Sequence, residues 1–113
     1  MASISMIGKG NVIEIAGMLS TEIRNSGMSC ELVDSIQRRV GDSTLYVMVF
    51  EKYYWRASNR ASLTVAVSGD GDNVYVDAIG SGGGQGPIFK MSWGAERSFV
   101  STVEQILLPL GFQ

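Results

Sequence analysis

The sequence contains no histidine and a single cysteine, Cys30, and these shortages exclude several common kinds of active site. Histidine is the usual acid–base catalyst near neutral pH and a frequent metal ligand, and cysteine is another main ligand of zinc. A Ser–His–Asp triad, a Cys–His pair and a zinc site within one chain are therefore excluded. One cysteine forms no internal disulfide, and we expect no metal and no cofactor.

Long apolar runs and an excess of basic residues are also missing. No segment approaches the roughly 20 apolar residues of a membrane-spanning helix, and the start MASISMIGKG lacks the apolar stretch of a signal peptide. The net charge is −2, whereas nucleic-acid binders normally present a basic face. We therefore expect a cytoplasmic protein that binds neither a membrane nor nucleic acid.

The sequence does contain enough apolar material for a packed core. Hydrophobic residues make up 45% of the 113 positions and charged residues 18%, which is typical of a globular protein. Neither a repeat nor a linker interrupts the chain. We expect one domain over residues 1–113.

Two stretches have the apolar spacing of amphipathic helices. Over Asn11–Asn25, apolar residues recur at helical spacing after Asn11, a good helix cap that is followed by Glu14 three residues later. A second helix is predicted from about Gly94 to Leu108, with Pro109 ending it.

The other apolar segments alternate as β-strands do. A short strand is predicted at Ser3–Ile7 and a longer one at Cys30–Val40, in which Leu32, Asp34 and Ile36 share one face.

The strongest predicted strand is Thr44–Arg56, whose first half is apolar on both faces. We expect this strand to be covered on both sides. Residues 61–80 form a predicted hairpin around the turn Gly69–Asn73.

The predicted order of elements is β-α-β-β-β-β-α. Four consecutive strands with short turns form an antiparallel meander, and two amphipathic helices cover one face of it. This is an α+β, two-layer sandwich, and its topology looks like the TATA-binding-protein-like and helix-grip folds. The likeness concerns architecture and assigns no function.

Four segments carry a family resemblance: Glu51–Tyr53, Asn59–Leu63, Gly69–Asp72 and Ser81–Gln85. With the helix that follows them, they resemble a family of small, uncharacterised bacterial proteins that share a domain of unknown function. The resemblance is strong over the C-terminal half and weak over the front of the chain. It implies a shared fold and brings no reaction with it.

The glycine-rich run Gly80–Gly86 is the candidate ligand site. The meander brings this run to the same end of the sheet as the turn around Asn59. Backbone N–H groups of the run could hold an anion, with Arg56 or Arg60 as the counter-charge. The candidate ligand-binding residues are Arg56, Asn59, Arg60, Asp77, Ser81, Gly82, Gly83, Gly84 and Gln85.

Each of these residues also has a structural explanation. The run lacks the Lys-Ser/Thr of a P-loop, so it can simply turn the chain after the last strand. Arg60 can pair with Glu51 or Asp77 on a neighbouring strand, and Asp77 can lie on a sheet face open to water. The catalytic alternative is a small enzyme with Asp77 and Glu51 as acid and base, which needs the two carboxylates about 5–9 Å apart.

The second face of the predicted sheet needs a cover, because both helices lie on the first. A second copy of the chain packing on the open face would supply it. The other possibility is an apolar ligand held between the helices and a curved sheet. We therefore expect a non-catalytic binding or interaction domain, with the small enzyme as the alternative.

Overall fold

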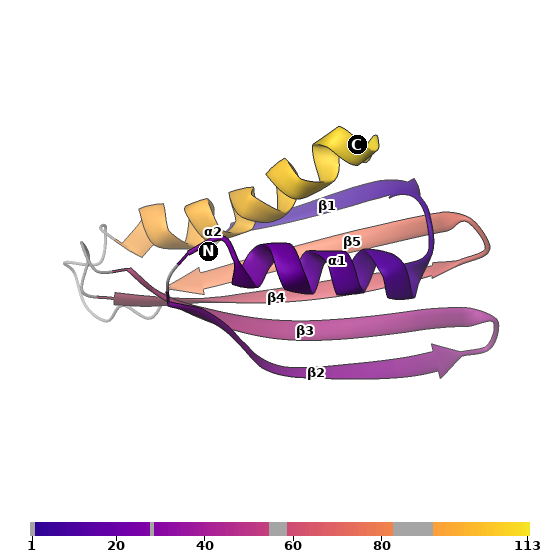
Figure 1. Ribbon diagram of the computed structural model, residues 1–113, viewed down its shortest axis with the longest axis horizontal. Coiled ribbons are helices and arrows are strands. Elements are labelled where there is room, and N and C mark those ends of the chain that lie inside the picture. Colours follow the sequence, from indigo (N-terminus) through magenta and orange to yellow (C-terminus); the bar gives the residue numbers. More distant parts are fainter. Residues whose placement is uncertain (1, 28, 55–58, 83–91) are drawn as a thin grey trace.

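The computed structural model describes residues 2–27, 29–54, 59–82 and 92–113, and at positions 59 and 92–94 the backbone alone. The elements are β1 (Ala2–Lys9), α1 (Val12–Arg24), β2 (Cys30–Val40), β3 (Ser43–Tyr54), β4 (Asn59–Asp70), β5 (Asn73–Gly82), α2 (Ser92–Leu107) and the short 3₁₀ helix η3 (Leu108–Leu110). The strands form one antiparallel sheet in the order β1-β5-β4-β3-β2, and both helices lie over one face of it (Figure 1). The predicted α+β class and element order are confirmed.

Helix α1 forms where the sequence offers a cap followed by an apolar stripe. The Oδ1 atom of Asn11 accepts a hydrogen bond from the backbone N–H of Glu14 at 3.1 Å, which satisfies one of the unpaired donors at the helix start. The stripe that faces the sheet consists of Val12, Ala16, Leu19 and Ile23, all buried. The predicted helix over Asn11–Asn25 is confirmed, with its two end residues as caps.

The core lies between the helices and the inner face of the sheet, the face that the helices cover. On β4 and β5 every second side chain is buried against them: Ala61, Leu63, Val65, Val67, Val74, Val76 and Ala78. Helix α2 contributes the fully buried Phe99, Val103 and Leu107. The hairpin prediction depends on this alternation of buried and exposed side chains, which has a period of two.

The end of the chain turns back onto the sheet. Gly111 has a left-handed φ of +89°, and the turn places Phe112 in the core, where its ring fills the space above Gly8. The backbone N–H of Ile7 donates to the carbonyl of Gln113 at 2.9 Å, and the N–H of Gln113 donates to the carbonyl of Ile7 at 3.0 Å. The C-terminal residues therefore pair with the edge of β1.

A β-bulge in β2 changes which face its residues occupy. Between Leu32 and Asp34 the register with β3 shifts, so Val33 has no partner of its own. The prediction that Leu32 shares a face with Asp34 and Ile36 is therefore wrong. Leu32 packs against the core, whereas Ile36 is 60% exposed on the other face.

Within the described residues, strand β3 is covered on one side alone. Its inner side chains, Met48 and Phe50, are buried under the helices. Its outer side chains are half-buried by their neighbours in the sheet: Leu45, Val47 and Val49. The described residues do not cover this strand on both sides as expected, because α1 and α2 pack on the same face.

Packing accounts for the first glycine of the glycine-rich run, Gly80. A Cβ atom at Gly80 would lie 2.8 Å from the carbonyl oxygen of Glu96 and 2.8 Å from Cγ2 of Val100, both on α2. Helix α2 therefore approaches β5 too closely for any side chain at this position. The first glycine of the run is required by packing between helix and strand.

We predict that Gly80→Ala lowers the free energy of unfolding by about 1–3 kcal/mol, because the added methyl group forces α2 away from β5. Gly17→Ala is the matched control: Gly17 lies within α1 and has nothing within 4 Å of an added Cβ. There alanine raises helix propensity, and we expect a gain of up to about 1 kcal/mol. Urea unfolding of both variants measures the difference, and an equal effect at the two positions would refute the close approach.

Candidate functional site

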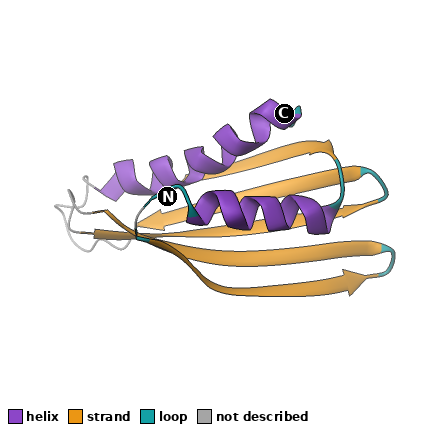
Figure 2. Cartoon of the chain, viewed as in Figure 1, coloured by secondary structure: helices purple, strands orange, loops and turns teal. Residues whose placement is uncertain are grey.

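Four strand ends meet at one end of the sheet. Cys30 lies opposite Lys52, and Ala61 lies opposite Gly82, so β2 and β4 begin where β3 and β5 end. The tight turns from β2 to β3 and from β4 to β5 lie at the far end (Figure 2). The prediction that Arg60 and the end of the last strand share one end of the sheet is confirmed.

The structure describes only part of the predicted ligand-binding set. Outside the described residues lie Arg56, Gly83, Gly84 and Gln85. Asn59 begins β4, and its side chain is not among those described. Arg60, Ser81 and Gly82 lie at the end where the strand ends meet, whereas Asp77 lies in the middle of β5.

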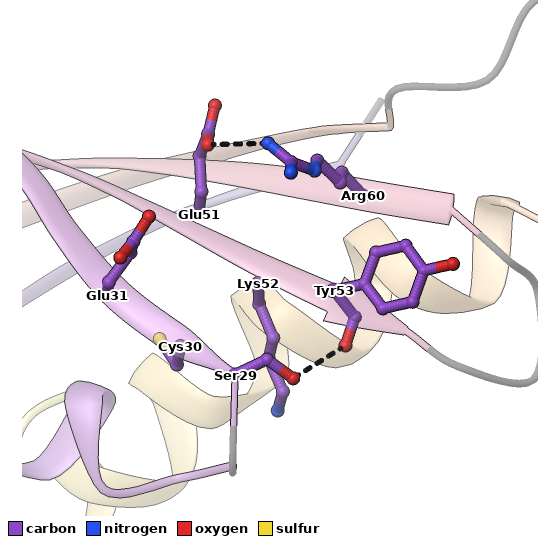
Figure 3. A pocket seen from close by; sticks show the side chains of 7 residues that line it. All are labelled: Ser29, Cys30, Glu31, Glu51, Lys52, Tyr53 and Arg60. Carbon is purple, nitrogen blue, oxygen red and sulfur yellow. Dashed lines mark hydrogen bonds and ion pairs between the residues drawn. The ribbon is translucent and has the colours of Figure 1, made fainter.

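A pocket of about 310 Å³ lies among these strand ends (Figure 3). It is lined by Ser29, Cys30, Glu31, Glu51, Lys52, Tyr53 and Arg60. In Figure 3, Glu31, Glu51 and Arg60 lie on one side of the strands, and Lys52 extends to the other. The Ser29 hydroxyl donates a hydrogen bond to the carbonyl of Tyr53 at 3.4 Å, which ties the start of β2 to the end of β3.

The pocket contains two carboxylates that repel each other and one guanidinium that pairs with one of them. Glu31 and Glu51 are direct cross-strand partners, an arrangement in which like charges repel. A guanidinium nitrogen of Arg60 lies 3.6 Å from a carboxylate oxygen of Glu51. Since the side chains of Arg60 and Glu51 are 70% and 41% exposed, this ion pair contributes little stability. Its consequence is local: an anion at Arg60 has to compete with Glu51.

The side chain of Ser81 is also engaged. Its hydroxyl and that of Ser62 on β4 lie 2.7 Å apart and are hydrogen-bonded. The proposed anion nest runs from Ser81 to Gln85, and most of it falls outside the described residues. The described part of this end of the sheet therefore leaves the anion hypothesis untested.

On the inner side of the same strand ends, Lys52 packs among aromatic rings. Its Nζ atom lies 5.1 Å from the ring centroid of Tyr54 and 5.8 Å from that of Phe99, both cation–π distances. It also donates to the carbonyl of Ser26 at 3.4 Å. Lys52 thus closes the gap between the end of α1 and the sheet, which is a structural role.

Burial raises the pKa of two titratable groups beside Lys52. Burial raises the pKa of the Cys30 thiol above its ordinary 9.0, and the positive charge of Lys52 opposes this rise. Burial likewise raises the pKa of Tyr54 above 10.0, opposed by the side chain of Ser98. Because the thiolate is the reactive form of cysteine, Cys30 is not an activated nucleophile at neutral pH.

The two carboxylates of the enzyme alternative lie far apart. Asp77 lies opposite Ala66 of β4, and Glu51 lies opposite Ser62, so two strand spacings and four residues separate them. Strand geometry makes this about 16 Å, beyond the roughly 5–9.5 Å of paired catalytic carboxylates. Asp77 is exposed and accepts a hydrogen bond from the Ser5 hydroxyl at 2.7 Å. Within the described residues, no group of three metal-ligating side chains is present either.

Exposed apolar side chains also lie on the sheet face opposite the helices, which we call the outer face. Its apolar side chains come from every strand: Ile7, Ile36, Val40, Leu45, Val47, Val49, Ala66, Tyr75 and Ile79. Ile36 is 60% exposed, Ile7 52% and Ile79 49%, which is unusual for aliphatic side chains gathered on one surface. In the described part of the chain, no element packs on this face (Figure 1).

Sequence reasoning named Arg60 and gave Glu51 or Asp77 as its partner, of which the structure shows Glu51. It missed Glu31 and Lys52 as pocket residues. The hairpin turn after Val40 could have located Glu31, because an antiparallel pair places residues equally far from the turn opposite each other. The bulge at Val33 shifts this count by one residue.

Comparison with protein families gives a match over nearly the whole chain. Residues 1–110 match the group described as "Family of unknown function (DUF6054)". The chain belongs to this family. The membership agrees with the predicted resemblance to a domain of unknown function, and it supplies no reaction or ligand. Comparison with curated proteins gave no match. Among the described helices, none is long and apolar enough to cross a membrane.

We predict that Tyr54→Phe stabilises the protein more at alkaline pH than at neutral pH. Because the folded state raises the pKa of Tyr54, its contribution to stability is complete below pH 10.0 and is lost as the pH rises through the folded-state pKa. Because phenylalanine has no ionising group, the variant does not lose this stability as the pH rises. Urea unfolding at neutral pH and above pH 10.0 measures the difference in the free energy of unfolding between the variant and the unmodified protein. The same difference at both pH values would contradict the burial of this hydroxyl.

Proposed function

We propose that this protein is a non-catalytic interaction domain that binds through its outer face, and that its partner on this face is a second copy of the chain. The observation that carries the proposal is the exposed apolar surface on the face opposite the helices. An apolar sheet face normally packs on a second layer. A second sheet packed face to face, about 10 Å away, is one of the common ways to bury such a surface.

The side chains of the outer face are mixed in polarity. Apolar side chains such as Val47, Val49 and Ile79 lie beside polar ones, and the charged Asp34, Arg38 and Asp77 are among them. Glu51 and Arg60 lie at one end, and Lys9 with Asn73 at the other, where the Lys9 ammonium donates to the Asn73 side chain at 2.8 Å. A typical protein–protein interface is itself only a little more than half apolar, so a mixed surface of this kind suits a protein partner.

The size of the outer face also supports a protein partner. Five strands about 4.8 Å apart and about ten residues long cover roughly 24 by 33 Å, or about 800 Å². A standard protein–protein interface buries about this area on each partner. A small ligand would cover only part of it.

The alternative of a small enzyme receives no support from the described residues. Its two carboxylates are separated by two strand spacings, and burial raises the pKa of the Cys30 thiol, which works against an activated thiolate. The pocket of Figure 3 contains carboxylates and one guanidinium that are already close together.

We predict that Val47→Lys halves the mass of the assembly in solution. Val47 lies near the middle of the outer face and points away from the core, so the charge opposes association and leaves the fold intact. Ile13→Lys is the matched control, because Ile13 is 44% exposed on α1, on the helical side. Light scattering after size-exclusion chromatography measures both masses. Equal masses for the two variants would refute the proposed interface.

A further inference from the structure

The two edges of the sheet differ in what covers them. The edge of β1 is partly paired, because Ile7 and Gln113 exchange two backbone hydrogen bonds. Strand β2 forms the other edge. In the part of the chain that the structure describes, no segment pairs with the free edge of β2, the edge that points away from β3. An unpaired edge presents a row of backbone donors and acceptors that another strand can join.

The second half of β2 is open to solvent on both faces. Its residues from Ile36 to Val40 are all exposed. The strand therefore offers both its backbone and its side chains to a partner. Edge strands are usually shortened, bulged or charged against such pairing, and β2 has its bulge near its start, at Val33. From Asp34 onward the strand is regular.

The charges of β2 change sign along the strand. Asp34 and Arg38 lie on the outer face, at alternate positions on either side of Ile36. Four residues separate them, about 13 Å, so they are too far apart to pair within one strand. The Asp34 carboxylate accepts the backbone N–H of Ser35 at 2.8 Å. Among the described residues, no carboxylate lies within ion-pair distance of Arg38.

We propose that β2 pairs antiparallel with β2 of a second copy about a two-fold axis at Ile36. An antiparallel pair reverses the direction of the second strand, so Asp34 of each copy comes opposite Arg38 of the other. Two cross-strand ion pairs then flank a central contact between the two Ile36 side chains. Opposite charges and apolar side chains facing each other across strands both stabilise a sheet.

The register follows from the charges and from the bulge. If the axis moved by one residue to Gln37, Asp34 would face Val40 and Ile36 would face Arg38, and both charges would lose their partners. If it moved the other way to Ser35, the bulge at Val33 would enter the paired segment. With the axis at Ile36, the regular ladder runs from Asp34 to Arg38, a common length for a paired strand.

This interface is built on the backbone of the β2 edge and does not depend on the face contact, although Ile36 borders both. A two-fold axis perpendicular to the sheet joins two five-stranded sheets into one and keeps both outer faces on the same side. Two such double sheets can then pack through their outer faces. Together the two contacts give a tetramer with two kinds of two-fold interface.

Charge reversal tests the edge interface in a background that lacks the face contact. We expect Val47→Lys to remain a dimer, held by β2, and we expect adding Asp34→Arg or Arg38→Asp to give monomers. An equimolar mixture of these two double variants restores both ion pairs, and we expect heterodimers in it. Light scattering and native mass spectrometry measure the mass of each variant and of the mixture. The proposal is overturned if the charge reversals leave the mass unchanged, or if the mixture stays monomeric.

A cysteine at the axis tests the register directly. In a Cys30→Ser background with Val47→Lys, Ile36→Cys places two thiols opposite each other, with Cβ atoms about 4.5–5.5 Å apart. We expect oxidised glutathione to convert this variant to a covalent dimer. Val40→Cys is the matched control, with an exposure of 58% against 60% for Ile36. Its thiols would be about 27 Å apart across the axis, and we expect no cross-link. Equal cross-linking of the two variants, or none in either, overturns the register.

Discussion

The whole structure depends on one constraint: α1 and α2 pack on the same face of a sheet that has apolar side chains on both. The inner face gains a complete core from this arrangement, with Leu63, Val65 and Val76 fully buried. The close approach of α2 to β5, which leaves no room for a side chain at Gly80, fixes the helix in that position. The outer face receives no cover from the described chain, and the edge of β2 receives no strand. The two contacts that we propose both follow from this imbalance.

Most of the fold could be predicted from local signals in the sequence. Asn11 caps a helix because its side chain reaches the N–H of Glu14, and this depends on residues close together in the chain. The alternation over β4 and β5 has a period of two that the buried face preserves. The position of Leu32 could not be predicted, because a bulge depends on how β2 and β3 pair and leaves no mark in the alternation itself.

The candidate site was less predictable than the fold. The topology of a meander brings Arg60 and Ser81 to one end of the sheet, and the Glu51 partner of Arg60 follows from strand order. The surroundings of Lys52 depend on α2, since Phe99 reaches it from the far end of the chain. The glycine-rich run had two explanations, and Gly80 illustrates the structural one: packing against Val100 excludes a side chain there.

We propose that the role of this domain is association, since the described chain covers one face of its sheet and leaves the other open. The central proposal is that the outer face and the β2 edge are occupied by other copies of the same chain. Sedimentation equilibrium of the unmodified protein over a wide range of concentrations tests this claim most directly. We predict a reversible assembly that reaches a tetramer. A protein that remains monomeric at every concentration would contradict it.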